Sequence, residues 1–197
     1  MQISFLTLVS ALKRIPRSGW ISHGISLYDV ESVADHTFST CALSMLLTDL
    51  EQGFGVKVNG ERVLKIATIH DLAESLTFDI SKGYLKYLGK RGSAMKNEIE
   101  TTAWKHLIKG MESYRLSRTY SKLQEEYMGN RTIEAQIVHA ADNLDILLQI
   151  TDLRRRGYPI RLMKDLWDQT LSRLQGRSVR SVRKLLKPIV EENRRLN

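Results

Sequence analysis

Hydrophobic residues recur along this chain at intervals of three and four, the spacing of one face of an α-helix, and the alternation typical of a β-strand is almost absent. Ile3, Leu6, Val9 and Leu12 predict a first helix, which Pro16 ends. A loop is expected up to about residue 31, and the glycine-rich stretch 78–92 is expected to be irregular. Further helices are predicted over about 32–52, 59–70, 94–108, 117–128, 131–156, 160–174 and 179–195. The pattern therefore predicts an all-α protein.

Capping residues indicate where several of these helices begin. Ser32 and Asp35 form an approximate capping box for the second helix, and Asn59 can cap the third. Pro188 is expected to kink or split the last helix, because it lacks an N–H group and crowds the preceding turn. On the second helix, the residues expected to face inward are Phe38, Cys41, Met45 and Leu46.

Length and composition are those of one globular domain. The chain has 197 residues, of which 42% are hydrophobic and 26% charged. Its single cysteine, Cys41, allows no internal disulfide and no cysteine-based zinc site. No uncharged run approaches the roughly 18–20 residues needed to span a bilayer, and the apolar N-terminal stretch lacks the marks of a signal peptide. We expect a cytoplasmic protein without a membrane partner.

Positive charge is concentrated in the C-terminal part of the chain. The formal net charge is +8, and residues 154–197 hold 13 Lys and Arg against 4 Asp and Glu. Such a basic region could hold nucleic acid, but it is also typical of the solvated face of an amphipathic helix, which we favour. The four cations Arg180, Arg183, Lys184 and Lys187 alternate at helical spacing with Val179, Val182, Leu186 and Ile189.

Four residues able to bind a metal occur where apolar residues would be expected. They are His36, the adjacent pair His70 and Asp71, and Asp142 in a long apolar helix. A buried carboxylate without a partner is costly, and a divalent metal would satisfy two imidazoles and two carboxylates together. Taken singly, each histidine could be a hydrogen-bonded core residue, and Asp142 could be a structural partner of His139.

The ordered set resembles the H…HD…D pattern of the HD-domain metal-dependent phosphohydrolases. The segment ESVADH at residues 31–36 is similar to the ESVSDH segment of the 5′-deoxynucleotidase branch of that family. HDLAE at 70–74 is similar to its HDxxE segment, and LKRIPRSGW at 12–20 resembles its LKR-x-x-RTGW segment. The resemblance covers about residues 6–150.

The resemblance implies a helical bundle of five to six core helices, to which the helices predicted after residue 157 are added as extra C-terminal helices. We expect an HD domain over residues 1–157 and a basic helical extension over 158–197 packed on it. One divalent ion would be bound by His36, His70, Asp71 and Asp142, with manganese, cobalt, iron or nickel preferred to magnesium or zinc. The implied reaction removes phosphate from (deoxy)nucleoside 5′-monophosphates by metal-activated water. Asp71 and Glu74 would be catalytic, although Glu74 could instead be an exposed helix carboxylate.

Substrate contacts are also implied by the resemblance. Arg17 and Trp20 correspond to residues that contact the phosphate and the sugar in the family, and Asp79 corresponds to a carboxylate that meets the sugar hydroxyl. Lys86 could supply a second donor to the phosphate. Phe78 stands where the family usually has glycine, so the preference for deoxyribose is open.

Two other functions are compatible with these residues. The first is an HD phosphohydrolase that acts on another phosphate, such as a nucleoside triphosphate, an alarmone or a cyclic nucleotide. The second is a nucleic-acid-binding module with a structural metal, which we do not favour because such a site does not require Glu74. By analogy with the family we expect a homodimer and a small nucleotide substrate.

Overall fold

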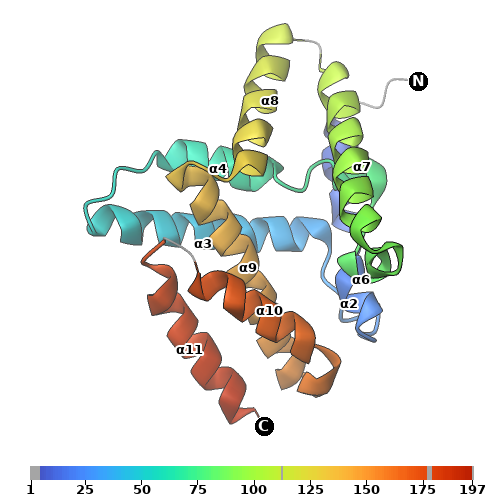
Figure 1. Ribbon diagram of the computed structural model, residues 1–197. Helices are drawn as coiled ribbons and strands as arrows, with labels where there is room; N and C mark the ends of the chain where they lie inside the picture. Colours follow the sequence, from blue (N-terminus) through green and yellow to red (C-terminus); the bar gives the residue numbers. More distant parts are fainter. Residues whose placement is uncertain (1–4, 112, 177–178, 197) are drawn as a thin grey trace. The chain divides into compact units, whose positions relative to one another are not determined.

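The computed structural model describes residues 5–111, 113–176 and 179–196, and these form an all-α fold (Figure 1). In these ranges the only β feature is an isolated bridge between Pro16 and Ser32. None of the helices in these ranges is long and apolar enough to cross a membrane. In chain order the elements are α1 (Phe5–Ala11), η1 (Leu12–Arg14), α2 (Ser18–Ser22), α3 (Val33–Gly53), α4 (Gly60–Ile69), α5 (Glu74–Thr77), α6 (Lys82–Leu85), η2 (Lys86–Leu88), α7 (Lys90–Lys109), α8 (Tyr114–Gly129), α9 (Ile133–Arg155), η3 (Ile160–Leu162), α10 (Lys164–Gln175) and α11 (Val182–Arg195).

The chain is divided into two compact units that do not follow the chain order. The first unit combines Met1–Thr37 with Thr68–Glu125, and the second combines Phe38–Ala67 with Glu126–Asn197. Helices α3, α4 and α8 each begin in one unit and end in the other. The domain boundary expected at residue 157 stays a prediction; residues 158–176 and 179–196 belong to the second unit, together with α9.

The first unit is built around α7. This helix packs against α5, α6 and η2, while α1 packs against α5 and α2 against α6 (Figure 1). Its buried apolar side chains come from short elements near the N-terminus and from the long helices α7 and α8, and they include Leu8, Leu12, Ile15, Trp104, Leu107 and Leu123. Residues 12–36 and 70–81, which both belong to this unit, contain most of the residues expected at the site.

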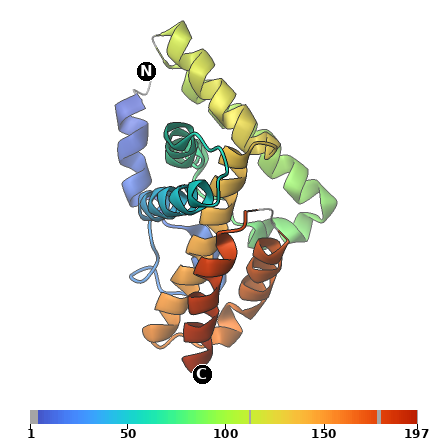
Figure 2. The same cartoon turned by 90° about the vertical axis from the view of Figure 1, so that its left-hand side faces the viewer.

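Helix α9 is the centre of the second unit. Of its 23 residues 13 are buried, and nine of these are apolar; α10 and α11 both pack against it (Figures 1 and 2). Thr132 caps its N-terminus by accepting a hydrogen bond from the Ala135 N–H at 3.2 Å. Gly157, with a φ of +97°, lies just beyond its C-terminus, in the left-handed conformation that glycine adopts most easily.

Capping residues set the starts of the two helices that lead into the site. Asp35 accepts a hydrogen bond from the Ser32 N–H at 2.9 Å, and Ser32 Oγ accepts one from the Asp35 N–H at 3.1 Å. The predicted capping box of α3 is therefore confirmed. Asn59 Oδ1 accepts from the Arg62 N–H at 3.0 Å, so the predicted cap of α4 is confirmed too.

The inward face predicted for the second helix is wrong. Phe38 is 76% exposed, Met45 and Leu46 are exposed, and Cys41 is half-buried. The buried residues in the middle of α3 are instead mainly small hydroxyl residues: Thr40, Ser44 and Thr48, together with Leu47. A hydroxyl can be buried on a helix when it bonds to its own backbone, as Thr48 Oγ1 does to the Ser44 carbonyl at 2.8 Å.

Two other expectations about the elements are corrected. The expected loop after Pro16 contains helix α2, and the stretch 78–92 contains α6, η2 and the start of α7. These helices are too short for a hydrophobic period to appear in the sequence. Helix α11 continues through Pro188 instead of being split there. Pro188 lies on the exposed face, where water can bond to the carbonyl that loses its partner.

Candidate metal centre

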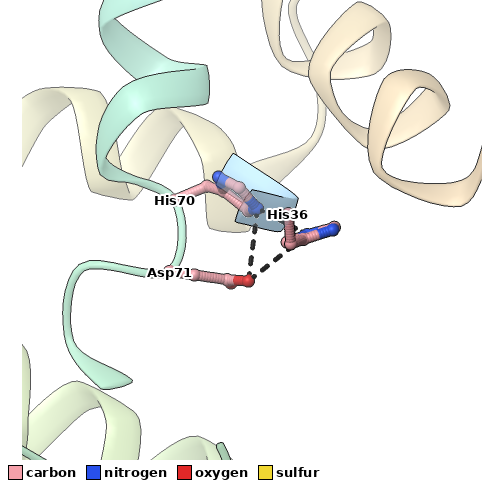
Figure 3. A group of neighbouring side chains, drawn as sticks. All are labelled: His36, His70 and Asp71. Atoms are coloured by element: carbon pink, nitrogen blue, oxygen red, sulfur yellow. Dashed lines mark hydrogen bonds and ion pairs between the residues drawn. The ribbon is translucent and has the colours of Figure 1, made fainter. Parts of the chain in front are cut away.

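Two imidazoles and one carboxylate converge in the first unit (Figure 3). The Nε2 atoms of His36 and His70 lie 3.3 Å apart. Asp71 Oδ2 lies 3.5 Å from His36 Nε2 and 3.3 Å from His70 Nε2. Both histidines are buried, His36 completely. Three of the residues predicted as metal ligands are therefore brought together at one point.

The three side chains are held by the ends of helices. His36 lies in the first turn of α3, where the capping box formed by Ser32 and Asp35 fixes the start of the helix. The expected third helix ends at Ile69, so His70 and Asp71 lie in the turn that follows it. Glu74 opens the short helix α5, which begins after this turn.

The surroundings of Asp71 keep it ionised. Burial acts to raise the pKa of its carboxyl, but His70, Arg17 and His36 outweigh burial and hold the pKa well below its usual value. Arg17 Nη1 donates a hydrogen bond to Asp71 Oδ2 at 2.9 Å. The carboxylate is therefore available as a charged ligand.

The donor set fits a divalent metal ion. Atoms bonded to one ion at about 2.0–2.2 Å lie roughly 3–3.5 Å from one another, which agrees with the three distances found. Imidazole nitrogen together with carboxylate oxygen suits the divalent transition metals. The cluster of His36, His70 and Asp71 is able to bind a metal.

Glu74 lies beside this cluster as a buried carboxyl group. The residue is 5% exposed, which excludes an exposed helix carboxylate, and its Oε2 has no hydrogen-bond partner within the described part of the chain. Burial, with the charges of Asp71 and Asp79, raises its pKa well above the usual value, and Arg17 and Lys96 oppose this rise. An unsatisfied buried oxygen is costly, so Glu74 Oε2 is available to bond to water or a ligand at this site.

The segment expected to bind phosphate, which contains Arg17 and Trp20, adjoins the metal cluster through the bond from Arg17 to Asp71. The Arg17 backbone N–H donates to the Glu31 carbonyl at 3.0 Å, which fixes the residue next to the capping box. Trp20 is 4% exposed, and its indole N–H donates to Glu31 Oε1 at 2.9 Å. Any contact of Trp20 with a substrate stays a prediction.

The loop after α5 is fixed at two successive carbonyl groups. Ser18 Oγ donates to the Asp79 carbonyl at 2.6 Å, and Lys96 Nζ donates to the Ile80 carbonyl at 2.8 Å. Neither donor was predicted from the sequence; Lys96 also forms an ion pair with Glu100, four residues further along α7, at 3.2 Å. Lys86 opens η2, and its side chain lies outside the described part of the structure.

Asp142 and His139 lie on α9, in the second unit. Asp142 is half-buried, and its part in the ligand set stays a prediction. His139 stacks on Tyr127 with ring centroids 4.1 Å apart, and its Nε2 lies 2.9 Å from the Tyr127 carbonyl oxygen. These contacts link the ends of α8 and α9, as expected of a structural histidine.

The fold and the cluster are those of a metal-binding hydrolase, and known proteins define its family. The model of a family described as HD domain matches residues 9–169. The chain is 32% identical over 163 residues to the 5′-deoxynucleotidase HDDC2 of Danio rerio, which covers 82% of this chain and 74% of that protein. It is 32% identical over 157 residues to the 5′-deoxynucleotidase hdd1 of Schizosaccharomyces pombe, with 78% and 73% covered. The chain therefore belongs to the HD domain family and is an HD-domain phosphohydrolase.

Solved structures resemble the chain along its length. A conserved hypothetical protein from Pyrococcus furiosus superposes with a TM-score of 0.75 at 34% identity, covering 97% of this chain and 98% of the other. An HD-domain phosphohydrolase from Listeria innocua superposes with a TM-score of 0.80 at 23% identity, covering 96% and 87%, and is similar in fold. The predicted all-α HD fold is confirmed.

Proposed function

We propose that this phosphohydrolase removes phosphate from nucleoside 5′-monophosphates, the deoxynucleotides among them. The observation that carries the proposal is that His36, His70 and Asp71 meet next to the buried carboxyl of Glu74, whose Oε2 has no hydrogen-bond partner within the described part of the chain. Relatives that are named 5′-deoxynucleotidases support the choice of substrate.

The metal is proposed to be one divalent ion held by His36, His70 and Asp71, with Asp142 as the fourth ligand. Manganese, cobalt, iron and nickel suit these nitrogen and oxygen donors better than magnesium does. When bound, such an ion polarises the phosphoryl oxygen and lowers the pKa of water.

Glu74 is proposed to transfer the proton. Hydrolysis forms a bond from a water oxygen to phosphorus and breaks the bond from phosphorus to O5′ of the nucleoside. The water must lose a proton and the leaving O5′ must gain one. Glu74 Oε2 has no competing hydrogen bond, so it can accept the first proton and donate the second.

The phosphate and the sugar are proposed to bind between α2 and the loop after α5. The guanidinium group of Arg17 has five N–H donors, so it can hold Asp71 and a phosphate oxygen together. Asp79 would bind a sugar hydroxyl and Lys86 a second phosphate oxygen. Trp20 is buried beneath this subsite in the proposal, and its indole N–H holds the side chain of Glu31.

We also propose a homodimer that functions in the cytoplasm. Phe38, Met45 and Leu46 are large apolar side chains exposed along α3, and exposed apolar patches are typical of protein interfaces. The experiment is light scattering coupled to size-exclusion chromatography, for the unmodified chain and for Phe38→Ser. A dimer that Phe38→Ser converts to monomer is expected, and a monomeric unmodified chain would contradict the interface. Binding of nucleic acid through α11 is not part of this proposal.

Phosphate release from a panel of substrates tests the proposed function. The panel contains deoxy- and ribonucleoside 5′-monophosphates, triphosphates and a cyclic nucleotide, each assayed after metal removal and after manganese or cobalt is restored. Metal-dependent release from the monophosphates is expected, with none from Asp71→Asn. Release from triphosphates or from the cyclic nucleotide alone would show that the enzyme acts on another class of phosphate substrate. If metal-loaded protein released phosphate from none of these substrates, the proposed enzymatic role would be contradicted.

A further inference from the structure

Phe78 has a backbone conformation that side chains other than glycine rarely adopt. It ends α5 with a φ of 58° and a ψ of 169°. A bulky residue at positive φ is an outlier, and this region of φ and ψ is populated almost only by glycine. The strain destabilises the folded chain, so the phenylalanine needs a compensating reason to stand there.

The surrounding contacts explain how the strain is maintained. Thr77 Oγ1 donates to the Phe78 carbonyl at 2.9 Å. The next two carbonyls along the chain, those of Asp79 and Ile80, are held by Ser18 and Lys96. Three successive peptide units are therefore fixed by side chains, and the loop cannot relax without losing these bonds.

Packing does not explain why the residue is phenylalanine. Its side chain is 67% exposed, so burial of the ring returns little of the free energy lost to the strain. The conformation and the exposure together leave an aromatic face presented to solvent at a fixed position.

Phe78 lies close in the chain to the groups that would bind and hydrolyse the substrate. Phe78 precedes Asp79, and it lies at the opposite end of the four-residue helix α5 from Glu74. Asp79 is close enough to Glu74 to contribute to the raised pKa of that carboxyl. A nucleotide with its phosphate at the His–Asp cluster would extend its sugar and base away from the cluster, and Asp79, the residue proposed to bind the sugar, is adjacent to Phe78 in the chain.

We propose that the ring of Phe78 stacks on the nucleobase of the substrate and so distinguishes nucleotides from sugar phosphates that lack a base. This inference rests on the proposed function, since it takes a nucleoside monophosphate as the ligand. Stacking on an aromatic face tolerates any base, so the contact gives affinity for nucleotides without strong preference among them.

Two substitutions separate the ring from the strain. Phe78→Ala removes the ring and keeps a strained backbone, whereas Phe78→Gly removes the ring and also relieves the strain. Tyr114→Ala removes an exposed aromatic ring from α8 and is the matched control. Calorimetry would measure the dissociation constants of dAMP and of 2-deoxyribose 5-phosphate, with every protein also carrying Glu74→Gln so that the ligand is not hydrolysed. Thermal unfolding would give the Tm of each variant.

Both Phe78 variants should bind dAMP about 5- to 100-fold more weakly and bind 2-deoxyribose 5-phosphate as the unmodified chain does. Only Phe78→Gly should raise the Tm, by about 2–8 °C. The control should change neither quantity. If the affinity for dAMP were unchanged, or if the affinities for both ligands fell equally, the stacking contact would be overturned and the proposed function would not. If the Tm of Phe78→Gly were unchanged, the strain at Phe78 would be overturned. No binding of dAMP by the unmodified chain would overturn this inference together with the proposed function.

Discussion

Glu74 is the residue on which the proposed chemistry depends most directly. Replacing it with glutamine keeps the size of the side chain but removes its ability to transfer a proton. We expect Glu74→Gln to lower kcat by about 10²- to 10⁴-fold, the usual contribution of a general acid or base. Metal affinity should be nearly unchanged, because Glu74 is not among the clustered ligands. A kcat within tenfold of the unmodified value, measured on metal-loaded protein, would show that another group moves the proton.

At the residue scale, the ligands could be predicted from the sequence and their environment could not. His36, His70 and Asp71 stand out because polar residues interrupt apolar stretches. The burial of Glu74 is set by packing in three dimensions, and so is the bond from Lys96 to the Ile80 carbonyl sixteen residues away. Neither follows from the spacing of residues along one helix. The strain at Phe78 likewise appears only in the backbone angles.

The start of helix α11 depends on a buried carboxylate from α3. Glu51 is almost fully buried, and its Oε1 accepts a hydrogen bond from the Ser181 N–H at 2.7 Å. Glu51→Ala leaves that donor without a partner, and we expect it to lower the free energy of unfolding by about 1–3 kcal/mol. Glu51→Gln keeps an acceptor and should cost less. Urea unfolding of both variants measures the difference, and equal losses would show that the hydrogen bond is not the cause.

A second link between elements predicts a pH dependence of stability. Glu126 at the end of α8 accepts from Arg62 of α4 at 2.5 Å and from Thr132 at 2.6 Å. Burial acts to raise the pKa of Glu126, but the bonds from Arg62 and Thr132 outweigh it, so the pKa lies below the usual value. The stabilisation is therefore full above the unfolded pKa of about 4.3 and is lost as the pH falls through the lower folded value.

We expect this contribution to be below about 1 kcal/mol, because the pair is partly exposed to solvent. Urea unfolding between pH 3 and pH 7 should show a steeper loss of stability at acid pH in the unmodified chain than in Glu126→Gln. Identical pH profiles for the two proteins would contradict the assignment.

At the scale of elements, the long helices could be predicted from the sequence, but the face that each helix buries was harder to predict. The caps at Ser32, Asn59 and Thr132 are local, so their residues can be recognised in sequence. On α3, hydroxyl residues are buried and Phe38 is exposed, which reverses the usual pattern. Hydrophobicity alone cannot predict such a helix, because its burial depends on which elements pack around it.

At the scale of the whole molecule, the class of fold was predictable because helical periodicity extends along nearly the entire chain. The division into two units was not, since each unit combines segments that are distant in sequence. The metal cluster lies in the first unit, whereas Asp142 lies in the second. Because His36, His70 and Asp71 come together only in the folded chain, metal binding is expected to stabilise the folded state, by about 2.7 kcal/mol when free metal is one hundredfold above its Kd. Thermal unfolding with and without manganese measures this, and an unchanged Tm would contradict it.

Titration of manganese into metal-free protein, with phosphate release from dAMP followed throughout, tests the central claim most directly. The account predicts that release rises with bound metal and saturates at one ion per chain. Asp71→Asn should bind the ion far more weakly and release little phosphate. Full phosphate release by the stripped protein, or a saturated metal site with no release from any nucleoside 5′-monophosphate, would contradict the account.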